Sequence, residues 1–313
     1  MKKRFLLIAV ALIVITGFAW AAGRRQADDG RIRVIFIAMD SVDEHWLTVR
    51  AGTEAKAQQL GNIDLSFNAP PDKLDALIQL QMVEDAITRR MHAILLAPLD
   101  RDAINPAVDR ARAAGIPVVI VDSAVSTAHD AFLATDNEAA ARMAADTLAQ
   151  LIGGQGQVAI INHQPGAGTA IARENPFRDQ MATRWPGITI VGTQFSDGDR
   201  ARALNIATDF MTAHPNLAAI YATNEGSTVG AGIAIEQAGR AGQVRFVGFD
   251  WSEDTRDLVQ RGVLDATMVQ NPFQMGYLGV QVAVDLVTGR ALANRNIDTG
   301  VSIITRENMH LLD

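Results

Sequence analysis

Short runs of β-branched and aliphatic residues recur along this chain, and a stretch with helical spacing follows most of them. The runs show no alternation of polar and apolar residues, which is typical of parallel strands buried on both faces. The helical pattern is clearest in residues 74–86 and 139–151. Strands that alternate with helices predict an α/β fold with right-handed crossovers. The predicted strands are residues 34–39, 63–67, 93–96, 117–121, 158–161, 188–191, 218–221, 244–249 and 266–269.

The number of strands predicts two domains. Roughly ten strands are more than one open sheet holds comfortably, and 313 residues correspond to about two average domains. No Pro- or Ser-rich linker separates the two halves of the chain. We therefore expect several close-set crossings between the domains instead of one flexible tether.

The first 22 residues have the pattern of a signal peptide. A positive start at residues 2–4 precedes the apolar run 5–18, and the small-residue pattern Ala-Trp-Ala-Ala follows at 19–22. The alternative is an uncleaved anchor, because residues 5–22 are at the lower limit for spanning a bilayer. Charged and polar residues at 24–31 favour cleavage and export to a periplasm.

Composition excludes several classes of function. The chain has no cysteine, which removes thiol nucleophiles, thiolate metal sites and iron–sulfur clusters, and its six histidines lack metal-ligand spacing. A net charge of −7 offers phosphate backbones no broad attraction. We expect no metal, no cofactor and no nucleic-acid partner. We also expect no enzyme, because residues 226–230 lack the spacing of a serine hydrolase elbow and no catalytic set assembles elsewhere.

Two glycine clusters and one histidine lie near predicted strand ends. The cluster at 153–156 precedes a strand, whereas a dinucleotide fingerprint follows one, so we interpret it as a helix stop and turn. The segment 166–169 does follow a strand, and it either wraps a ligand or only makes a turn. His163 also follows a strand, where a hydrogen-bonded surface position is favoured over one that faces a cleft.

Polar and aromatic residues gather at the predicted carboxyl ends of the strands, where open α/β sheets bind their ligands. Carboxylates, amides and rings without a catalytic pair suit a neutral ligand with many hydroxyls. Taken singly, Asp122, Asp250 and Asn224 could cap helices instead, and Trp46 could be a core anchor. The residues at the strand ends are Asp40-Ser41 with Trp46, Asp122-Ser123, Asn224-Glu225, Phe249-Asp250-Trp251 and Gln270-Asn271.

Several segments, in order along nearly all of the chain after residue 33, resemble the periplasmic sugar-binding proteins of the ribose-binding type. They are residues 43–46 (DEHW), 93–98 (AILLAP), 115–122 (GIPVVIVD), 135–137 (TDN), 173–177 (RENPF), 212–215 (TAHP), 222–225 (ATNE), 247–250 (VGFD) and 266–270 (ATMVQ).

The resemblance implies the type I periplasmic binding protein fold, with two Rossmann-like lobes of parallel sheet joined by a three-crossing hinge. The N-terminal lobe would comprise residues 31–135 and 271–299, and the C-terminal lobe residues 136–270 and 300–313. It further implies a monomer whose cleft closes on a small ligand, such as a monosaccharide, and an ABC permease as partner.

The ligand contacts of the resembled family carry over onto Asp122, Arg173, Asn224, Asp250 and Gln270, with Phe249 as its stacking or wall residue and Trp46 as an aromatic position. With the neighbouring Asp40 and Ser41, these nine residues form the predicted site. The chain departs from ribose binders at Ala97, at Ser123 after Asp122, at residues 197–199 and at Asp40. The departures remove donors and add an acid, which leaves another sugar, a polyol or a ligand with a positive group open.

The resemblance favours an exported solute receptor that delivers a sugar or related polyhydroxyl ligand to an ABC-type importer. The alternative is a ligand receptor that presents its closed form to a membrane sensor kinase or chemoreceptor. Repressors of the LacI type share these lobes, but they need a DNA-binding headpiece where this chain has an export signal.

Overall fold

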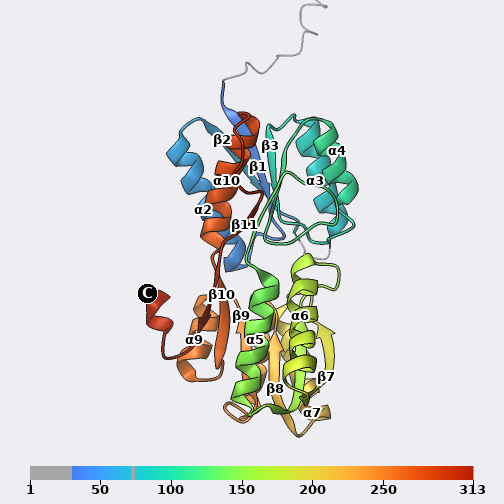
Figure 1. The fold of residues 1–313 in the computed structure, drawn as a ribbon, viewed down its shortest axis with the longest axis vertical. Helices are drawn as coiled ribbons and strands as arrows, with labels where there is room; N and C mark the ends of the chain where they lie inside the picture. Colours follow the sequence, from blue (N-terminus) through green and yellow to red (C-terminus); the bar gives the residue numbers. More distant parts are fainter. Residues whose placement is uncertain (1–29, 72–74, 313) are drawn as a thin grey trace, which may run out of the picture. The chain divides into compact units, whose positions relative to one another are not determined.

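The computed structural model describes residues 30–71 and 75–312 (Figure 1). The compact unit that begins at Ile32 contains two six-stranded sheets, named here the β1 sheet and the β6 sheet. The predicted signal peptide lies outside the described residues. Among the described residues no helix is both long and apolar enough to cross a bilayer.

The β1 sheet has the strand order β11-β5-β4-β3-β1-β2, and all its pairings are parallel. Helices α2 and α10 cover one face, and α3 and α4 cover the other (Figure 1). The strands are β1 (Ile32–Ile37), β2 (Ile63–Asn68), β3 (Ala93–Leu96), β4 (Val118–Val121), β5 (Ala131–Ala134) and β11 (Asn296–Asp298). The helices are α2 (Glu44–Leu60), α3 (Ala76–Thr88), α4 (Asn105–Ala113) and α10 (Pro272–Val287).

The β6 sheet has the order β12-β10-β9-β8-β6-β7, in which only β12 is antiparallel. Helices α5 and α6 pack on one face, and α7, α8 and α9 on the other. The strands are β6 (Gln155–Asn162), β7 (Gly187–Phe195), β8 (Leu217–Ala222), β9 (Arg245–Phe249), β10 (Ala266–Gln270) and β12 (Val301–Ile304). The helices are α5 (Asn137–Leu151), α6 (Gly168–Arg184), α7 (Arg200–Ala213), α8 (Glu225–Gln237), α9 (Glu253–Arg261) and the 3₁₀ turn η1 (Met309–Leu312).

The predicted α/β fold is confirmed, and each of the predicted strands corresponds to a strand of the structure. Sequence patterns missed β5, β11 and β12. These strands are only three or four residues long, and β11 (Asn296–Asp298) is mostly polar. Such short segments give too weak a periodicity to separate them from loops. The helix stop and turn expected at residues 153–156 is confirmed for 153–154, which follow the end of α5 at Leu151, whereas residues 155 and 156 already belong to β6.

The chain changes sheet after β5, after β10 and after β11. Two of these passages are joined by hydrogen bonds: Thr299 N donates to Ala134 O at 2.9 Å, and Thr135 Oγ1 donates to Gly300 O at 3.1 Å. The two passages therefore run side by side. The predicted residue limits of the two lobes stay a prediction.

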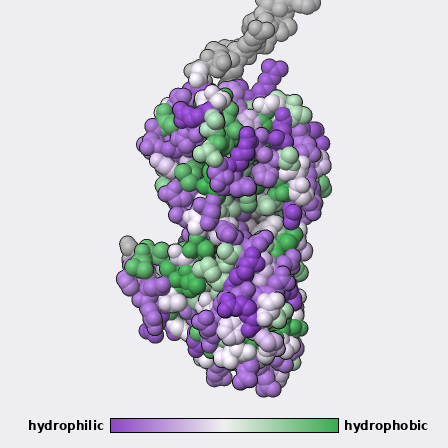
Figure 2. Space-filling model, viewed as in Figure 1, coloured by the Kyte–Doolittle hydropathy of each residue, from purple (hydrophilic) through white to green (hydrophobic). Residues whose placement is uncertain are grey.

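Helix α2, whose first turn reaches the candidate site, is positioned by a close approach to α10. A Cβ atom at Gly276 would overlap with Val49 O, and one at Gly52 would overlap with Phe273 O. Only glycine permits backbones to approach this closely. On the face drawn in Figure 2 the surface is largely hydrophilic, and hydrophobic residues gather near the C-terminus, where Leu311 is 70% exposed. The larger apolar side chains lie mostly in the four core clusters against the sheets.

Candidate ligand site

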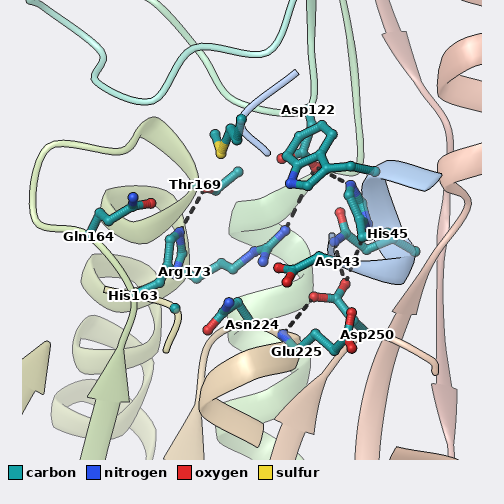
Figure 3. A pocket seen from close by; sticks show the side chains of 14 residues that line it. Asp43, His45, Asp122, His163, Gln164, Thr169, Arg173, Asn224, Glu225 and Asp250 are labelled. Carbon is teal, nitrogen blue, oxygen red and sulfur yellow. Dashed lines mark hydrogen bonds and ion pairs between the residues drawn. The ribbon is translucent and has the colours of Figure 1, made fainter. Parts of the chain in front are cut away.

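A pocket lies where the carboxyl ends of strands from both sheets come together (Figure 3). Six of the nine predicted site residues line it: Trp46, Asp122, Arg173, Asn224, Asp250 and Gln270. The other lining residues are Met39, Asp43, His45, His163, Gln164, Thr169, Gly198 and Glu225. The pocket thus gathers residues that are more than 200 positions apart in the sequence.

Asp122 and Asp250 are the two strand-end carboxylates, and both have a left-handed backbone. Asp122 directly follows β4 with φ 64°, and Asp250 directly follows β9 with φ 73°. Non-glycine residues adopt this conformation uncommonly, and strained residues of this kind cluster at functional sites.

Asp250 is held by groups of its own sheet. Its Oδ2 accepts from the backbone N–H of Glu225 at 3.0 Å, and its Oδ1 accepts from Gln270 Nε2 at 2.6 Å. The alternative that Asp250 caps the following helix is wrong, because Ser252 caps α9 with a capping box. Asp250 instead stabilises the first turn of α8, which begins at Glu225.

Asp122 faces the side chains of His45 and Arg173 without a close contact to either. Its Oδ1 lies 3.6 Å from His45 Nε2 and 4.0 Å from Arg173 Nη2. Both distances exceed those of a hydrogen bond, so these buried atoms have no hydrogen-bond partner in the protein. The alternative that Asp122 caps a helix does not hold either, because the next element is the strand β5.

Two hydrogen bonds orient the guanidinium group of Arg173, and its Nη2 nitrogen is left without a partner in the protein. Its Nε donates to Asn137 Oδ1 at 2.7 Å, and its Nη1 donates to Thr223 O at 2.8 Å. The guanidinium carbon lies 4.3 Å from the centre of the Phe249 ring. Phe249 is fully buried and lies outside the lining of the pocket, so its ring supports Arg173.

Asp40 and Ser41 also lie outside the lining of the pocket. The Asp40 Oδ1 atom accepts from the backbone N–H groups of Val42 at 2.7 Å and Asp43 at 2.8 Å. Asp40 therefore shapes the turn before α2, while Ser41 is exposed to solvent. The turn presents Asp43, His45 and Trp46 to the pocket instead.

Trp46 and Asn224 each combine two roles that the sequence presents as alternatives. Trp46 is 4% exposed and belongs to the core of the β1 sheet, yet it lines the pocket and packs edge-on against His45 with ring centres 4.7 Å apart. Asn224 caps α8 by accepting from Ser227 N at 3.1 Å, and it also lines the pocket. Structural and ligand-facing roles are compatible at both positions.

The surface position favoured for His163 is wrong, whereas the hydrogen bonding expected there and the alternative that it faces the pocket are both confirmed. The side chain is 5% exposed, with Nδ1 2.8 Å from Thr223 Oγ1 and Nε2 2.9 Å from Thr169 Oγ1. The contact with Thr169 ties the end of β6 to the first turn of α6. Its position after a strand was the only signal in the sequence that could have indicated the pocket.

Glu225 is a pocket residue that sequence reasoning noted beside Asn224 but did not assign to the site. Its Oε1 accepts from Arg200 Nη2 at 2.8 Å, whereas its buried Oε2 has no hydrogen-bond partner. Burial, followed by repulsion from Asp43 and Asp250, raises the pKa of Glu225 to about 7. A carboxyl group in this state can accept a hydrogen bond or donate one near neutral pH.

Five residues that line this pocket each have a buried polar atom without a hydrogen-bond partner in the protein: His45 Nε2, Asp122 Oδ1, Arg173 Nη2, Glu225 Oε2 and Gln270 Oε1. Buried polar groups are nearly always hydrogen-bonded, and each unmet one is costly. The set contains both donors and acceptors, as a ligand with several hydroxyl groups requires. Within residues 30–71 and 75–312 no group of His, Asp and Glu side chains could hold a metal ion.

The sequence matches the family described as "Periplasmic binding protein domain" over residues 34–291. The chain belongs to this family. The D-allose-binding periplasmic protein of Escherichia coli K12 is 32% identical over 249 residues, which cover 77% of this chain and 79% of that protein. The ribose import binding protein of the same strain is 32% identical over 247 residues, covering 78% and 81%. The resemblance seen in the sequence motifs is thereby confirmed.

Solved periplasmic binding proteins have the same fold. An ABC transporter solute-binding protein from Agrobacterium vitis with bound D-fucose is 37% identical, with a TM-score of 0.86 over 88% of this chain and 96% of that one. A carbohydrate transporter solute-binding protein from Agrobacterium radiobacter in complex with D-arabinose is 31% identical, with a TM-score of 0.87 over 90% and 96%. Members of this family bind solutes and are not enzymes, as expected for this chain.

Proposed function

We propose that this protein is an exported solute receptor that captures a monosaccharide or related polyhydroxyl ligand between two lobes and delivers it to an ABC-type importer. The observation that carries the proposal is the convergence of unmet buried donors and acceptors from both sheets on one pocket. Family membership and the relatives of this chain, which include allose and ribose binders, support a sugar as the ligand.

In this proposal, different pocket residues contact different groups of the bound sugar. Asp122 Oδ1 accepts from a ligand hydroxyl, and Arg173 Nη2 donates to another; both groups are more than nine-tenths buried, which strengthens charge-assisted hydrogen bonds. Asn224 and Gln270 bring amide groups, and Trp46 brings an aromatic ring that can cover an apolar face of the sugar. Asp40 and Ser41 do not contact the ligand but belong to the turn before α2, and Phe249 supports Arg173.

Ligand contacts from both sheets would select a closed arrangement of the lobes. Asp122 and Trp46 belong to the β1 sheet and its helices, whereas Arg173, Asn224 and Asp250 belong to the β6 side. Residues 31–135 and 271–299 form one lobe in this proposal, and residues 136–270 and 300–313 form the other. The receptor acts as a monomer in the periplasm, after removal of residues 1–22, and docks on a membrane permease.

A thermal-shift screen of the mature protein against pentoses, hexoses and polyols tests the proposal, followed by calorimetry on the hits. At 100 times the dissociation constant a ligand adds roughly 2.7 kcal/mol to the free energy of unfolding, which raises the melting temperature visibly. Export is checked separately by fractionation. A protein that binds no member of the panel contradicts the proposed ligand class, and recovery of uncleaved protein only from membranes contradicts export to the periplasm.

A further inference from the structure

Carboxylates outnumber cationic groups in the pocket. Asp43, Asp122, Glu225 and Asp250 line it, whereas Arg173 is the one Arg or Lys side chain in the lining within the described part of the chain. Arg173 and His45 both face Asp122. His45 also lies near Asp250, with its Nδ1 3.9 Å from Asp250 Oδ1. Asp250 and the other two carboxylates lie around the first turn of α8 (Figure 3). We name Asp43, Glu225 and Asp250 the acidic corner.

The acidic corner has a fixed geometry. The backbone N–H of Glu225 donates to Asp250 Oδ2 at 3.0 Å, which keeps these two residues together. Asp43 reaches the corner from the turn before α2 and repels Glu225 electrostatically. Arg200 balances the corner from outside the pocket, where it also pairs with Asp254. The groups that face Glu225 are therefore Asp43, Asp250 and Arg200, with His45 beyond Asp250 at 3.9 Å.

Two buried acceptors beside the corner have no hydrogen-bond partner in the protein. They are Glu225 Oε2 and Gln270 Oε1, on side chains that are 2% and 7% exposed. Gln270 Nε2 donates to Asp250, so the Gln270 oxygen is the end of that amide that is left for a ligand. This amide oxygen is an observation independent of the carboxylates, and it also calls for a donor at the same place.

We propose that the acidic corner binds a protonated amino group of the ligand, so that the preferred ligand of this site is an amino sugar or amino polyol. The inference rests on the proposed function and specifies its ligand class. An ammonium group presents three N–H donors and a positive charge, whereas a hydroxyl presents one donor and no charge. A neutral sugar adds no positive charge to the corner beyond that of Arg200 outside the pocket, whereas an ammonium adds one inside it and supplies donors for the two acceptors.

Calorimetry at about pH 6, where the amine is protonated, tests the inference with matched triplets: D-glucose, D-glucosamine and N-acetyl-D-glucosamine, and the same three forms of galactose. A charged hydrogen bond contributes about 1.5–3 kcal/mol, so the better hexosamine should bind about 10- to 100-fold more tightly than its parent sugar and its N-acetyl form. Equal or tighter binding of a neutral sugar overturns the inference and leaves the proposed function standing. Binding of neither hexosamine also overturns the inference, and only a protein that binds no member of the pentose, hexose and polyol panel overturns the proposed function as well.

Glu225→Gln separates the corner from the rest of the pocket. The substitution keeps the size and removes the charge, so the ratio of amino-sugar to neutral-sugar affinity should fall by about tenfold or more. Asp254→Asn is the matched control, because Asp254 contacts the same Arg200 but is half-exposed and outside the pocket. This control should keep the wild-type ratio. An unchanged ratio in Glu225→Gln, with folding verified by circular dichroism, overturns the assignment of the corner.

Proton release gives a readout that a merely structural role of Glu225 would not change. An ammonium beside Glu225 lowers its pKa from about 7, so near pH 6 binding expels a proton that the free protein holds. Calorimetry in two buffers of different ionisation enthalpy measures this proton. Wild-type protein should release it with an amino sugar, and Glu225→Gln should not. Equal proton release by both proteins contradicts the inference.

Discussion

Asp122 and Asp250 occupy equivalent positions in the two sheets, yet their surroundings differ. Each follows the fourth strand, in chain order, of a sheet with the same arrangement of its first five strands, and each has a left-handed φ. Asp250 accepts hydrogen bonds from Glu225 N and Gln270 Nε2. Asp122 Oδ1 accepts none. The same backbone feature therefore builds a structural carboxylate on one side of the pocket and an available carboxylate on the other.

A position at the end of a strand therefore does not by itself determine whether a carboxylate is structural or available to a ligand. The hydrogen-bond donors to Asp250 come from the elements before and after β9, α8 and β10, whereas its contact with His45 is longer, at 3.9 Å. The neighbours of Asp122 are His45 and Arg173, of which Arg173 comes from the β6 side. A ligand is then the natural partner for Asp122.

The largest expected effect is that of Asp250→Asn. The substitution places a donor where the carboxylate accepts, so one of its two structural hydrogen bonds is lost. We expect the free energy of unfolding to fall by about 1–3 kcal/mol and ligand affinity to fall about fivefold to more than a hundredfold. Denaturant unfolding and calorimetry measure the two changes. Unaltered affinity would remove Asp250 from the site, and unaltered stability would refute its structural role.

Asp122→Asn should reduce affinity over the same range, about fivefold to more than a hundredfold, with a smaller loss of stability than Asp250→Asn. Asparagine tolerates the left-handed backbone, and no hydrogen bond of the Asp122 carboxylate is broken by the change. The same two measurements apply. Equal losses of stability in Asp122→Asn and Asp250→Asn would contradict the difference in structural role between the two aspartates.

Glu225 gives a prediction about pH. Its pKa is about 7 in the folded protein against 4.5 ordinarily, so between these values the folded state holds a proton that the unfolded state has lost. The free energy of unfolding should therefore decrease as pH rises from about 4.5 to 7, by about 1–3 kcal/mol, and level off above. Glu225→Gln should lack this part of the profile. Denaturant unfolding of both proteins across this pH range measures the effect. Superimposable pH profiles of the free energy of unfolding for wild type and Glu225→Gln would contradict the prediction.

Gly168→Ala should have the smallest effect, and it probes the contact between the two sides of the pocket. A Cβ at Gly168, the first residue of α6, would lie 2.7 Å from Ala124 O, which follows β4. The clash opposes closure, so affinity should fall by about two- to tenfold with little change in the stability of the free protein.

Gly192→Ala is the matched control for this variant. A Cβ there would make only an ordinary contact, 3.5 Å from the Phe210 ring, within the β6 side. It should leave affinity unchanged. Small-angle scattering of Gly168→Ala with saturating ligand should show a larger radius than wild type. Identical radii and affinities would show that this contact does not govern closure.

Sequence patterns alone predict the α/β fold, most of the strands and five residues that line the pocket: Trp46, Asp122, Asn224, Asp250 and Gln270. Arg173 follows only from the family resemblance. Buried parallel strands are marked by local aliphatic runs, and their carboxyl ends must meet at one edge of each sheet, so Asp122, Asn224, Asp250 and Gln270 could be placed before any coordinates. These inferences need only the residues within a few positions of each strand.

What each side chain contacts depends on the tertiary structure. Asp40 stabilises a turn and Phe249 packs against Arg173, whereas Glu225 and His163 line the pocket. These outcomes depend on burial and on partners far away in the chain, such as the pairing of Arg200 with Glu225 and of His163 with Thr223. Local patterns carry no information about such partners, because pKa shifts, unmet hydrogen bonds and close approaches arise only after the elements have packed.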